Sequence, residues 1–495
     1  MDHLLAAVDI GSNSFRLSVA RVVQHEGEPQ LYPVDRLKET VRLAAGLDEN
    51  NVLSQDAIDR AIAVLGRFGE RLHSFIPSRV RAVATNTFRV ARNTPEFLPR
   101  AEAALGFPIE VIAGREEARL IYLGVVHSLP ASDNKRLVID IGGGSTEVVI
   151  GKGLEPGLMT SLHMGCLTYS RQFFADGVIT AERMRQAEMM ARREAEVISK
   201  TYRRTGWKEA FGSSGTAKAL YAILTECGFS DRGITRAGMN KLKERIIRSG
   251  RVIPSELPGI KLERAAVLPG GLAIMGALFD ELGIEQMDTG DGALRVGVLH
   301  DLLGRDVAKD TRDQSVRQFM KRYHVDMNQA QRVRQAALKF FDTIYEPGDK
   351  HAELRNALAW TADLHEVGLS IAHGAYHKHT AYVLANADMP GFSQADQELL
   401  ALLALGHQGK LTKLESMVRH RSQWVAILCL RLSVLLMRRR ADIAQLPLSV
   451  TVDGKRFVVH VNQMWLAKHP LSEYTLRSEE AEWGKVGFTF EVREL

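Results

Sequence analysis

Cysteine is scarce in this chain, and its scarcity excludes two classes of protein. Only Cys166, Cys227 and Cys429 occur among 495 residues. A disulfide framework needs paired cysteines, and a cysteine metal site needs ligands at short spacing. We therefore expect a protein of the reducing cytoplasm, with three cysteines that serve as packing residues.

Long apolar segments and a secretory leader are also lacking. A membrane-spanning helix needs roughly 20 apolar residues, and runs such as 424–430 are much shorter. The first residues, MDHLLAAVDIG, contain neither a basic leader segment nor a small-residue cleavage site. We expect a soluble protein that has no membrane partner.

A strong excess of one charge is absent overall, since 64 Lys and Arg face 59 Asp and Glu. The charge is uneven locally. Between residues 410 and 440 there are eight basic residues and one acidic residue, Glu415. Such a segment attracts polyanions, although a solvated helix face would have the same composition. The basic residues are Lys410, Lys413, Arg419, Arg421, Arg431, Arg438, Arg439 and Arg440.

The chain is too long for one core, and an internal match suggests how it divides. Residues 8–19 (VDIGSNSFRLSV) align with residues 139–150 (IDIGGGSTEVVI), so that Asp9 falls on Asp140 and Gly11 on Gly142. Each copy predicts a strand, a tight glycine and serine turn, and a second strand. Two α/β domains descended from one are the natural inference.

The remaining pattern sets the expected boundaries. Helical periodicity at 54–72 and 115–126 and strand-like runs at 80–84 and 109–112 indicate mixed α/β sequence. Helical pattern dominates from 306 to about 446, and strands are expected at 448–452, 457–461 and 486–492. We predict domains at 1–122, 123–305, 306–446 and 447–495, the last a small α+β piece with a hairpin turn at Asp453-Gly454.

The two glycine turns carry the first chemical signal. Glycine lets the backbone approach an anion, consecutive N–H groups point at it, and the leading Asp offers an oxygen to a hard cation. Because a strand follows each turn, the pattern differs from a Walker loop or a dinucleotide fingerprint. A third glycine loop, residues 211–217, precedes a helical pattern and is a potential anion site, although helix capping by Ser214 or Thr216 accounts for it as well.

These features together resemble a known family. Paired DxG phosphate loops resemble the actin-like, ribonuclease H-like ATPase superfamily. The stretches ATNTFR (84–89), GREEARLI (114–121) and LVIDIGGGSTE (137–147) are similar to the exopolyphosphatase and guanosine pentaphosphatase family, and MGC (164–166), GALR (292–295) and HEVGL (365–369) continue the match. The resemblance implies two duplicated ribonuclease H-like (actin-like) domains, then an all-helical HD-like domain. It also implies a phosphohydrolase that needs Mg²⁺, with potassium as a possible stimulant, and that forms a homodimer.

The resemblance also assigns residues. Glu117 corresponds to the catalytic base, and a carboxylate there suits removal of a proton from attacking water. Glu116 is the rival, because neighbours on a helix point about 100° apart and only one can face the cleft. Arg89 matches a phosphate-binding arginine, and its fork suits two phosphate oxygens. The expected phosphate-binding residues are Asp9, Gly11, Ser12, Asn13, Ser14, Gly142, Gly143, Gly144, Ser145, Thr146, Ser213, Ser214 and Gly215.

Three carboxylates are the expected metal ligands. Asp140 and Glu147 would reach the metal from the loop and from the following strand, with Glu117 beside them. The first copy carries Arg16 where the second carries Glu147, so only one half is specialised for the metal. In the helical region, Glu366 follows His365 where an HD domain has Asp, and we expect a degenerate HD-like domain without a second metal site.

The sequence thus predicts an exopolyphosphatase that removes terminal phosphate processively from inorganic polyphosphate. Hydrolysis of guanosine-5'-triphosphate,3'-diphosphate (pppGpp) is the alternative, since it uses the same chemistry. An actin-like kinase would need an acceptor-binding Asp in the cleft, and a non-catalytic sensor would not need Glu117, Asp140 and Glu147 together. No specific nucleic acid partner is expected.

Overall fold

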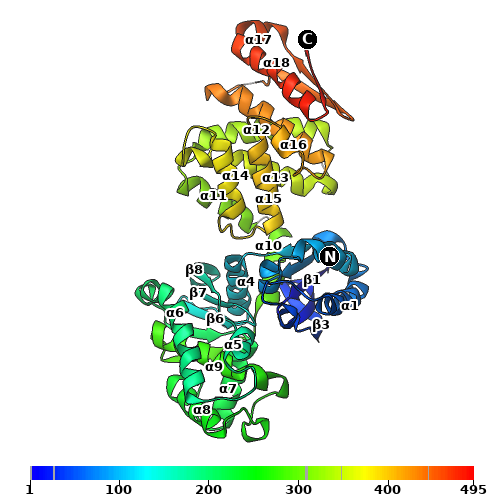
Figure 1. The fold of residues 1–495 in the computed structure, drawn as a ribbon. Helices are drawn as coiled ribbons and strands as arrows, with labels where there is room; N and C mark the ends of the chain where they lie inside the picture. Colours follow the sequence, from blue (N-terminus) through cyan, green and yellow to red (C-terminus); the bar gives the residue numbers. More distant parts are fainter. Residues whose placement is uncertain (1–2, 26–27, 307–309, 347, 444, 495) are drawn as a thin grey trace. The chain divides into compact units, whose positions relative to one another are not determined.

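A computed structural model describes residues 3–494 apart from 26–27, 307–309, 347 and 444 (Figure 1). The chain divides into two compact units, the first ending at Asp310 and the second beginning at Thr311. The predicted boundary near residue 305 thus lies five residues before the division between the units.

The first unit opens with a five-stranded sheet of order β3-β2-β1-β4-β5. The glycine turn at Gly11 joins two antiparallel strands, and β4 and β5 run parallel to β1. Helix α1 begins after Ser54, whose side chain accepts a hydrogen bond from the amide of Ala57, and buries one apolar face. The elements are β1 (His3–Ile10), β2 (Ser14–His25), β3 (Glu28–Thr40), α1 (Gln55–Leu72), β4 (Val80–Ala84), α2 (Asn86–Val90), α3 (Thr94–Leu105) and β5 (Ile109–Val111).

A six-stranded sheet of order β10-β11-β9-β6-β7-β8 follows. Its glycine turn at Gly142 joins antiparallel strands β6 and β7, and β9 runs parallel to β6. The elements are β6 (Lys135–Ile141), β7 (Thr146–Lys152), β8 (Glu155–Leu162), α5 (Cys166–Phe173), α6 (Ala181–Thr205), β9 (Glu209–Gly212), α7 (Gly215–Glu226), β10 (Ile234–Thr235), α8 (Arg236–Ser249), α9 (Leu268–Leu282) and β11 (Gln286–Thr289).

The two sheets repeat one topology. The order β3-β2-β1-β4-β5 corresponds to β8-β7-β6-β9-β11, with two antiparallel pairs followed by two parallel pairs in both. Asp9 and Asp140 therefore occupy equivalent places near the carboxyl ends of β1 and β6. That the two halves descend from one ancestor stays a prediction.

Two helices form the layer between the sheets, α4 (Gly114–His127) and α10 (Leu294–Asp306). Their apolar side chains share one core with Leu5 and Ala7 of β1 and with Val138 and Val149 of the second sheet. The helices approach backbone to backbone, because a Cβ on Gly297 would lie 1.8 Å from the carbonyl oxygen of Leu120. The predicted boundary at residues 122 and 123 therefore falls inside α4, and α10 contacts the first sheet as well as α4.

One helical stretch of the first unit is longer than the apolar runs identified in the sequence. Residues 262–282 form 21 helical residues that contain an 18-residue window of mean hydropathy 1.4, which meets the length and composition of a membrane span. In the structure 78% of this window is buried inside the protein, where α9 packs against α5 and α6. This stretch is therefore a helix of the protein core.

The second unit begins with helices and ends with a small sheet of order β12-β13-β14. The predicted hairpin at Asp453-Gly454 joins β12 and β13, with Gly454 in the left-handed region at φ 55°. Strand β14 starts three residues later than expected, since Gly487 turns the chain at φ 78°. The elements are α11 (Thr311–Arg322), α12 (Met327–Ile344), α13 (Ala352–Leu364), α14 (Tyr376–Asn386), α15 (Gln394–Gly406), α16 (Arg421–Leu436), β12 (Leu448–Asp453), β13 (Arg456–Val461), α17 (Gln463–Lys468), α18 (Pro470–Lys485) and β14 (Thr489–Glu494).

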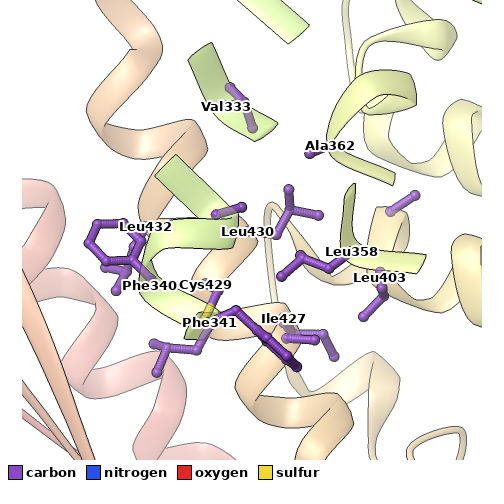
Figure 2. Close-up of a cluster of buried hydrophobic side chains, with 14 of the residues drawn as sticks. Val333, Phe340, Phe341, Leu358, Ala362, Leu403, Ile427, Cys429, Leu430 and Leu432 are labelled. Atoms are coloured by element: carbon purple, nitrogen blue, oxygen red, sulfur yellow. The ribbon is translucent and has the colours of Figure 1, made fainter. Parts of the chain in front are cut away.

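A single apolar core runs through the second unit. Figure 2 shows its helical part, where Phe340 and Phe341 of α12 lie among Leu358, Leu403 and Leu430. The same core includes side chains of the terminal sheet, and the rings of Trp424 and Trp483 meet edge to face at 5.8 Å. The predicted boundary at residues 446 and 447 therefore does not separate two cores.

Candidate active site

The two glycine turns face each other across a narrow cleft in the first unit. A Cβ on Gly143 would lie 3.3 Å from the Cβ of Ser12, and one on Gly144 would lie 2.2 Å from the side-chain amide of Asn86. The cleft encloses a cavity of about 140 Å³. The sequence motifs, 131 residues apart, therefore form one site.

Backbone hydrogen bonds orient the turns. The carbonyl oxygen of Asn13 accepts from the amides of Val41 and Arg42, and that of Gly143 accepts from Leu167 and Thr168 at the start of α5. Within the described part of the chain, the amides of Ser12, Asn13, Gly143 and Gly144 donate to no protein acceptor. Amides left free beside a cleft form a concave anion site of the kind that binds phosphate.

The third loop joins the same cavity. The Ser213 hydroxyl donates to the carboxylate of Asp140, and Ser214 caps α7 by accepting from the amide of Ala217 at 3.2 Å. The guanidinium of Arg264 lies directly over Gly215, where a Cβ would be 2.0 Å from it. Ser214 is thus the helix cap, and anion binding by this loop stays a prediction.

The structure separates Glu116 from Glu117. Glu116 is buried and forms a double hydrogen bond with Arg119, at 2.7 and 2.8 Å. Glu117 lines the cavity, and its Oε2 accepts from Nη1 of Arg89 at 2.8 Å. Glu117 is therefore the carboxylate available to a substrate, and Glu116 belongs to a buried ion network.

Arg89 hydrogen-bonds both to the protein backbone and to Glu117, a carboxylate that lines the cavity. Its Nη1 donates to the carbonyl oxygen of Ile112 as well as to Glu117, both at 2.8 Å. The residue comes from the short helix α2, which follows β4 at the same edge of the sheet as the first glycine turn. Arg89 is not among the residues that line the cavity, so its link to the site in this structure is the hydrogen bond to Glu117, and direct binding of phosphate by Arg89 stays a prediction.

Asp140 and Glu147 are cross-strand partners on β6 and β7, so their side chains lie on one face of the sheet. Asp140 lines the cavity, whereas Glu147 is buried behind it and accepts from the Ser161 hydroxyl at 2.8 Å. Thr146 points to the opposite face, where its hydroxyl donates to the carbonyl oxygen of Met164 at 2.7 Å. Of the predicted phosphate-binding residues, Thr146 is therefore the one with a side chain directed away from the cleft.

Negative charge is concentrated here at an electrostatic cost. Burial raises the pKa of Asp9, Glu117 and Asp140, and that of Glu147 rises well above its usual range through burial and the nearby carboxylates of Glu117 and Asp140. Arg89 opposes the rise at Glu117, and Ser213 opposes it at Asp140. Buried ionisable groups whose pKa values are shifted by burial and by specific neighbouring groups are typical of catalytic sites.

The fit to a metal ion is partial. Among the described residues, no group of three or more His, Cys, Asp or Glu side chains is spaced to hold a metal ion. Asp140, Glu147 and Glu117 each accept a hydrogen bond from the protein, from Ser213, Ser161 and Arg89 respectively. Mg²⁺ usually binds through one or two carboxylates together with water and substrate phosphates, and the donor set of hard oxygens fits that mode.

Among the further residues that line the cavity, four have charged, hydroxyl or amide side chains that the sequence did not assign to it: Arg16, Thr85, Asn86 and Arg264. Arg16 was visible as the counterpart of Glu147. Thr85 and Asn86 belong to the ATNTFR motif (84–89) that contains Arg89, so this motif could have marked them as site residues. Arg264, on the turn before α9, carries no pattern that could have marked it.

The second unit holds His365 of the HD-like motif and a second buried histidine, His407. The rings of His365 and His407 meet edge to face at 5.7 Å, and each Nδ1 bonds a backbone carbonyl of its own helix. Glu366 pairs with Arg440 rather than with a ligand. Burial lowers the pKa of both histidines, which favours their neutral form.

The basic segment of residues 410–440 is only partly free. Arg431 is buried and forms a double hydrogen bond with Glu479, at 2.6 and 2.8 Å. Arg440 pairs with Asp326 and Glu366. Lys410, Arg419, Arg421, Arg438 and Arg439 are exposed, so most but not all of the basic residues counted in the sequence contribute to a positive surface.

Comparison with known proteins places this geometry in a family. The chain resembles a solved Ppx/GppA family member of Aquifex aeolicus, at 28% identity and TM-score 0.51 over 62% of this chain and 99% of that one. A solved exopolyphosphatase of Cytophaga hutchinsonii shares the fold, at 22% identity and TM-score 0.54 over 61% of this chain and 98% of that one. The model of the Ppx/GppA phosphatase family matches residues 18–306, and that of Ppx/GppA phosphatase domain III matches residues 311–480. The chain therefore belongs to the Ppx/GppA phosphatase family.

Proposed function

We propose that this phosphatase hydrolyses the terminal phosphoanhydride bond of inorganic polyphosphate. The observation that carries the proposal is the convergence of Glu117, Asp140 and two turns of free amides on one cavity. The amides suit the oxygens of a terminal phosphate. Glu117 suits the role of general base for a water molecule, because it is buried beside the cleft and oriented by Arg89.

A magnesium ion, when bound, would neutralise the charge of the phosphate oxygens, and Asp140 and Glu147, with Glu117 beside them, are the residues that would hold it. The protein's own groups position the substrate and accept the proton. The loop amides position the terminal phosphate, Arg89 fixes the Glu117 carboxylate, and Glu117 accepts the proton of the attacking water.

The lining of the cavity favours polyphosphate over pppGpp. Throughout the described residues that line it, aromatic side chains are absent, and the walls combine glycines, hydroxyls, amides, carboxylates and arginines with several aliphatic side chains. Guanine recognition usually needs a stacking surface, whereas an inorganic chain needs only anion donors.

The test is a direct comparison of the two substrates. Orthophosphate release is followed with long-chain polyphosphate and with pppGpp under the same magnesium concentration. We expect the larger kcat/KM with polyphosphate. A larger kcat/KM with pppGpp would reassign the substrate, and release from neither would point to a sensor or to a kinase that needs an acceptor.

A further inference from the structure

A contact between two hydroxyl groups joins helix α2 to the first glycine turn. Thr87 of α2 donates from Oγ1 to Oγ of Ser12 at 2.8 Å. Both side chains are buried, and a hydrogen bond is electrostatically stronger in such surroundings than in water. Ser12 lines the cavity, whereas Thr87 is not among the residues that line it. Thr87 therefore reaches a ligand in the cavity through Ser12 rather than directly.

The Ser12 hydroxyl keeps its own proton for a ligand. A hydroxyl group can donate one hydrogen bond and accept two. The bond from Thr87 takes up one accepting position, and among the described residues Oγ of Ser12 donates to no protein acceptor. Because a lone pair of this oxygen points at Thr87, the O–H bond cannot point there as well. The contact thus turns the proton of Ser12 away from α2.

The opposite side of the cleft offers a place where an anion would accept this proton. A Cβ on Gly143 would lie 3.3 Å from Cβ of Ser12, and one on Gly144 would lie 3.8 Å from its Oγ. The amides of both glycines donate to no acceptor in the described part of the chain. A phosphate held by these two amides therefore comes within reach of the Ser12 hydroxyl as a third donor.

The packing of α2 fixes the direction of the Thr87 side chain. Threonine is β-branched, and a helix restricts its χ1 angle. The next residue, Phe88, is buried against Phe97 of α3, with ring centroids 4.9 Å apart. The Thr94 hydroxyl, also of α3, donates to the carbonyl oxygen of Phe88 at 2.8 Å. Helix α2 is therefore anchored to α3, and it presents Thr87 to Ser12 in one orientation.

We propose that Thr87 is a positioning residue, which aims the Ser12 hydroxyl at an oxygen of the terminal phosphate. This inference rests on the proposed function, since the phosphate that the loop amides hold is taken to be the one that is cleaved. The phosphate accepts this hydrogen bond in the bound substrate as well as during the attack of water. Loss of the bond should therefore raise KM and leave kcat little changed.

The test is a double-mutant cycle on Thr87 and Ser12 in the full-length protein. We would measure kcat and KM for phosphate release from tripolyphosphate, and the affinity for orthophosphate by calorimetry. Valine keeps the shape of threonine without its donor, so Thr87→Val should raise KM and weaken orthophosphate binding roughly three- to tenfold. Thr87→Ser should restore both values. In a Ser12→Ala background, Thr87→Val should cause no further loss.

Thr94→Val is the matched control, because it removes the other buried hydroxyl bond of this segment. It should lower the melting temperature at least as much as Thr87→Val does, with KM and orthophosphate affinity at the wild-type values. A rise in KM for Thr94→Val equal to that for Thr87→Val would mean that loosened packing of α2 accounts for both, and would contradict the positioning role. Thr87→Ala repeats the cycle if the valine variant does not fold.

The outcomes separate this role from the proposed function. The positioning role is wrong if Thr87→Val binds orthophosphate as the wild type does, or weakens binding equally with and without the Ser12 hydroxyl. Tighter binding by Thr87→Val would also overturn it, because Ser12 would then be the donor in the pair. If the wild type releases no phosphate from polyphosphate, while orthophosphate binding still depends jointly on Thr87 and Ser12, the proposed function is wrong and the positioning role stands.

Discussion

Arg89 donates a hydrogen bond of 2.8 Å from Nη1 to Oε2 of Glu117, and this contact joins the motif after β4 to the start of α4. It fixes the direction of a carboxylate on the first turn of a helix. Glu116, the adjacent residue, is turned into the protein by Arg119. The contrast between the two neighbouring glutamates gives the sharpest test of the site.

Glu117→Gln should lower kcat for phosphate release by about 10² to 10⁴, the usual effect of losing a general base, with KM little changed. The amide keeps the shape of the side chain, so the melting temperature should stay near that of the wild type. Glu116→Gln is the control, and it should lower the melting temperature while leaving kcat within a few-fold. The reverse pattern would make Glu116 the base.

Asp140→Asn and Glu147→Gln should each raise the magnesium concentration needed for half-maximal activity, because a hard cation loses an anionic oxygen. Removal of divalent ions with a chelator should abolish activity, and added Mg²⁺ should restore it. Glu209→Gln is a suitable control. Glu209, on β9, pairs with Arg136 of β6, and neither residue lines the cavity. Magnesium titrations of both variants that overlay the wild type would refute the metal role.

Much of this site was predictable because its signals are local. The strand–turn–strand motifs at Asp9 and Asp140, the helix at 115–126 and the strand at 80–84 are each written in a short segment, and the structure places them with α4 (Gly114–His127) and β4 (Val80–Ala84). The choice between Glu116 and Glu117 was not predictable, because it depends on Arg89 and Arg119, which are brought to α4 by different elements.

Other features escaped prediction because they depend on long-range packing. Residues 123–305 were expected to form one domain, yet α10 of that range packs against β1 of the first sheet and approaches the α4 backbone closely at Gly124 and Gly297. Likewise, a terminal domain was expected from 447, whereas Trp483 completes a core begun by α16. Sequence pattern shows which face of an element is apolar and leaves open which other element covers it.

The buried histidines predict that the second unit loses stability in acid. Burial lowers the pKa of His365 and His407, so the unfolded chain binds more protons than the folded one once the pH falls below about 6.5, the ordinary histidine value. Stability therefore rises with pH in that range, by up to about 1.4 kcal/mol per pH unit for each histidine. Below the unfolded pKa the loss grows as the pH falls toward 5.

Urea unfolding at pH 5 to 7.5, followed by tryptophan fluorescence, tests this, since Trp360, Trp424, Trp465 and Trp483 lie in the second unit. His407→Asn keeps a donor for the carbonyl of Ala404 but cannot be protonated. The difference in unfolding free energy between wild type and variant should shrink or change sign as the pH falls. A constant difference across the range would mean that His407 does not titrate on unfolding.

Asp301 is the residue whose loss should connect the folding of the first unit to catalysis. It is buried on α10, and its two carboxylate oxygens accept separately, one from Arg81 of β4 at 2.7 Å and one from Arg119 of α4 at 2.5 Å. Arg81 also bonds Glu110 of β5, at 2.9 and 3.0 Å. Asp301 thereby ties the helix that carries Glu117 to the sheet that carries the first glycine turn.

Asp301→Asn replaces an ion with an isosteric amide and leaves two buried arginines short of one negative charge. Breaking a buried ion pair typically costs about 3 to 5 kcal/mol, so the melting temperature should fall clearly. Among molecules that remain folded, rotation of α4 should misplace Glu117, and a displacement of 1 Å can lower the rate about 10²-fold. We therefore expect kcat to fall while the affinity of tripolyphosphate for the folded protein stays near the wild-type value, because the anion donors lie on the glycine turns.

Asp280→Asn, which removes an ion pair with Arg236 elsewhere in the first unit, controls for loss of stability alone. If Asp301→Asn lowers the melting temperature and leaves kcat per folded molecule unchanged, the network is a stabilising one only and Glu117 is positioned by Arg89 without it.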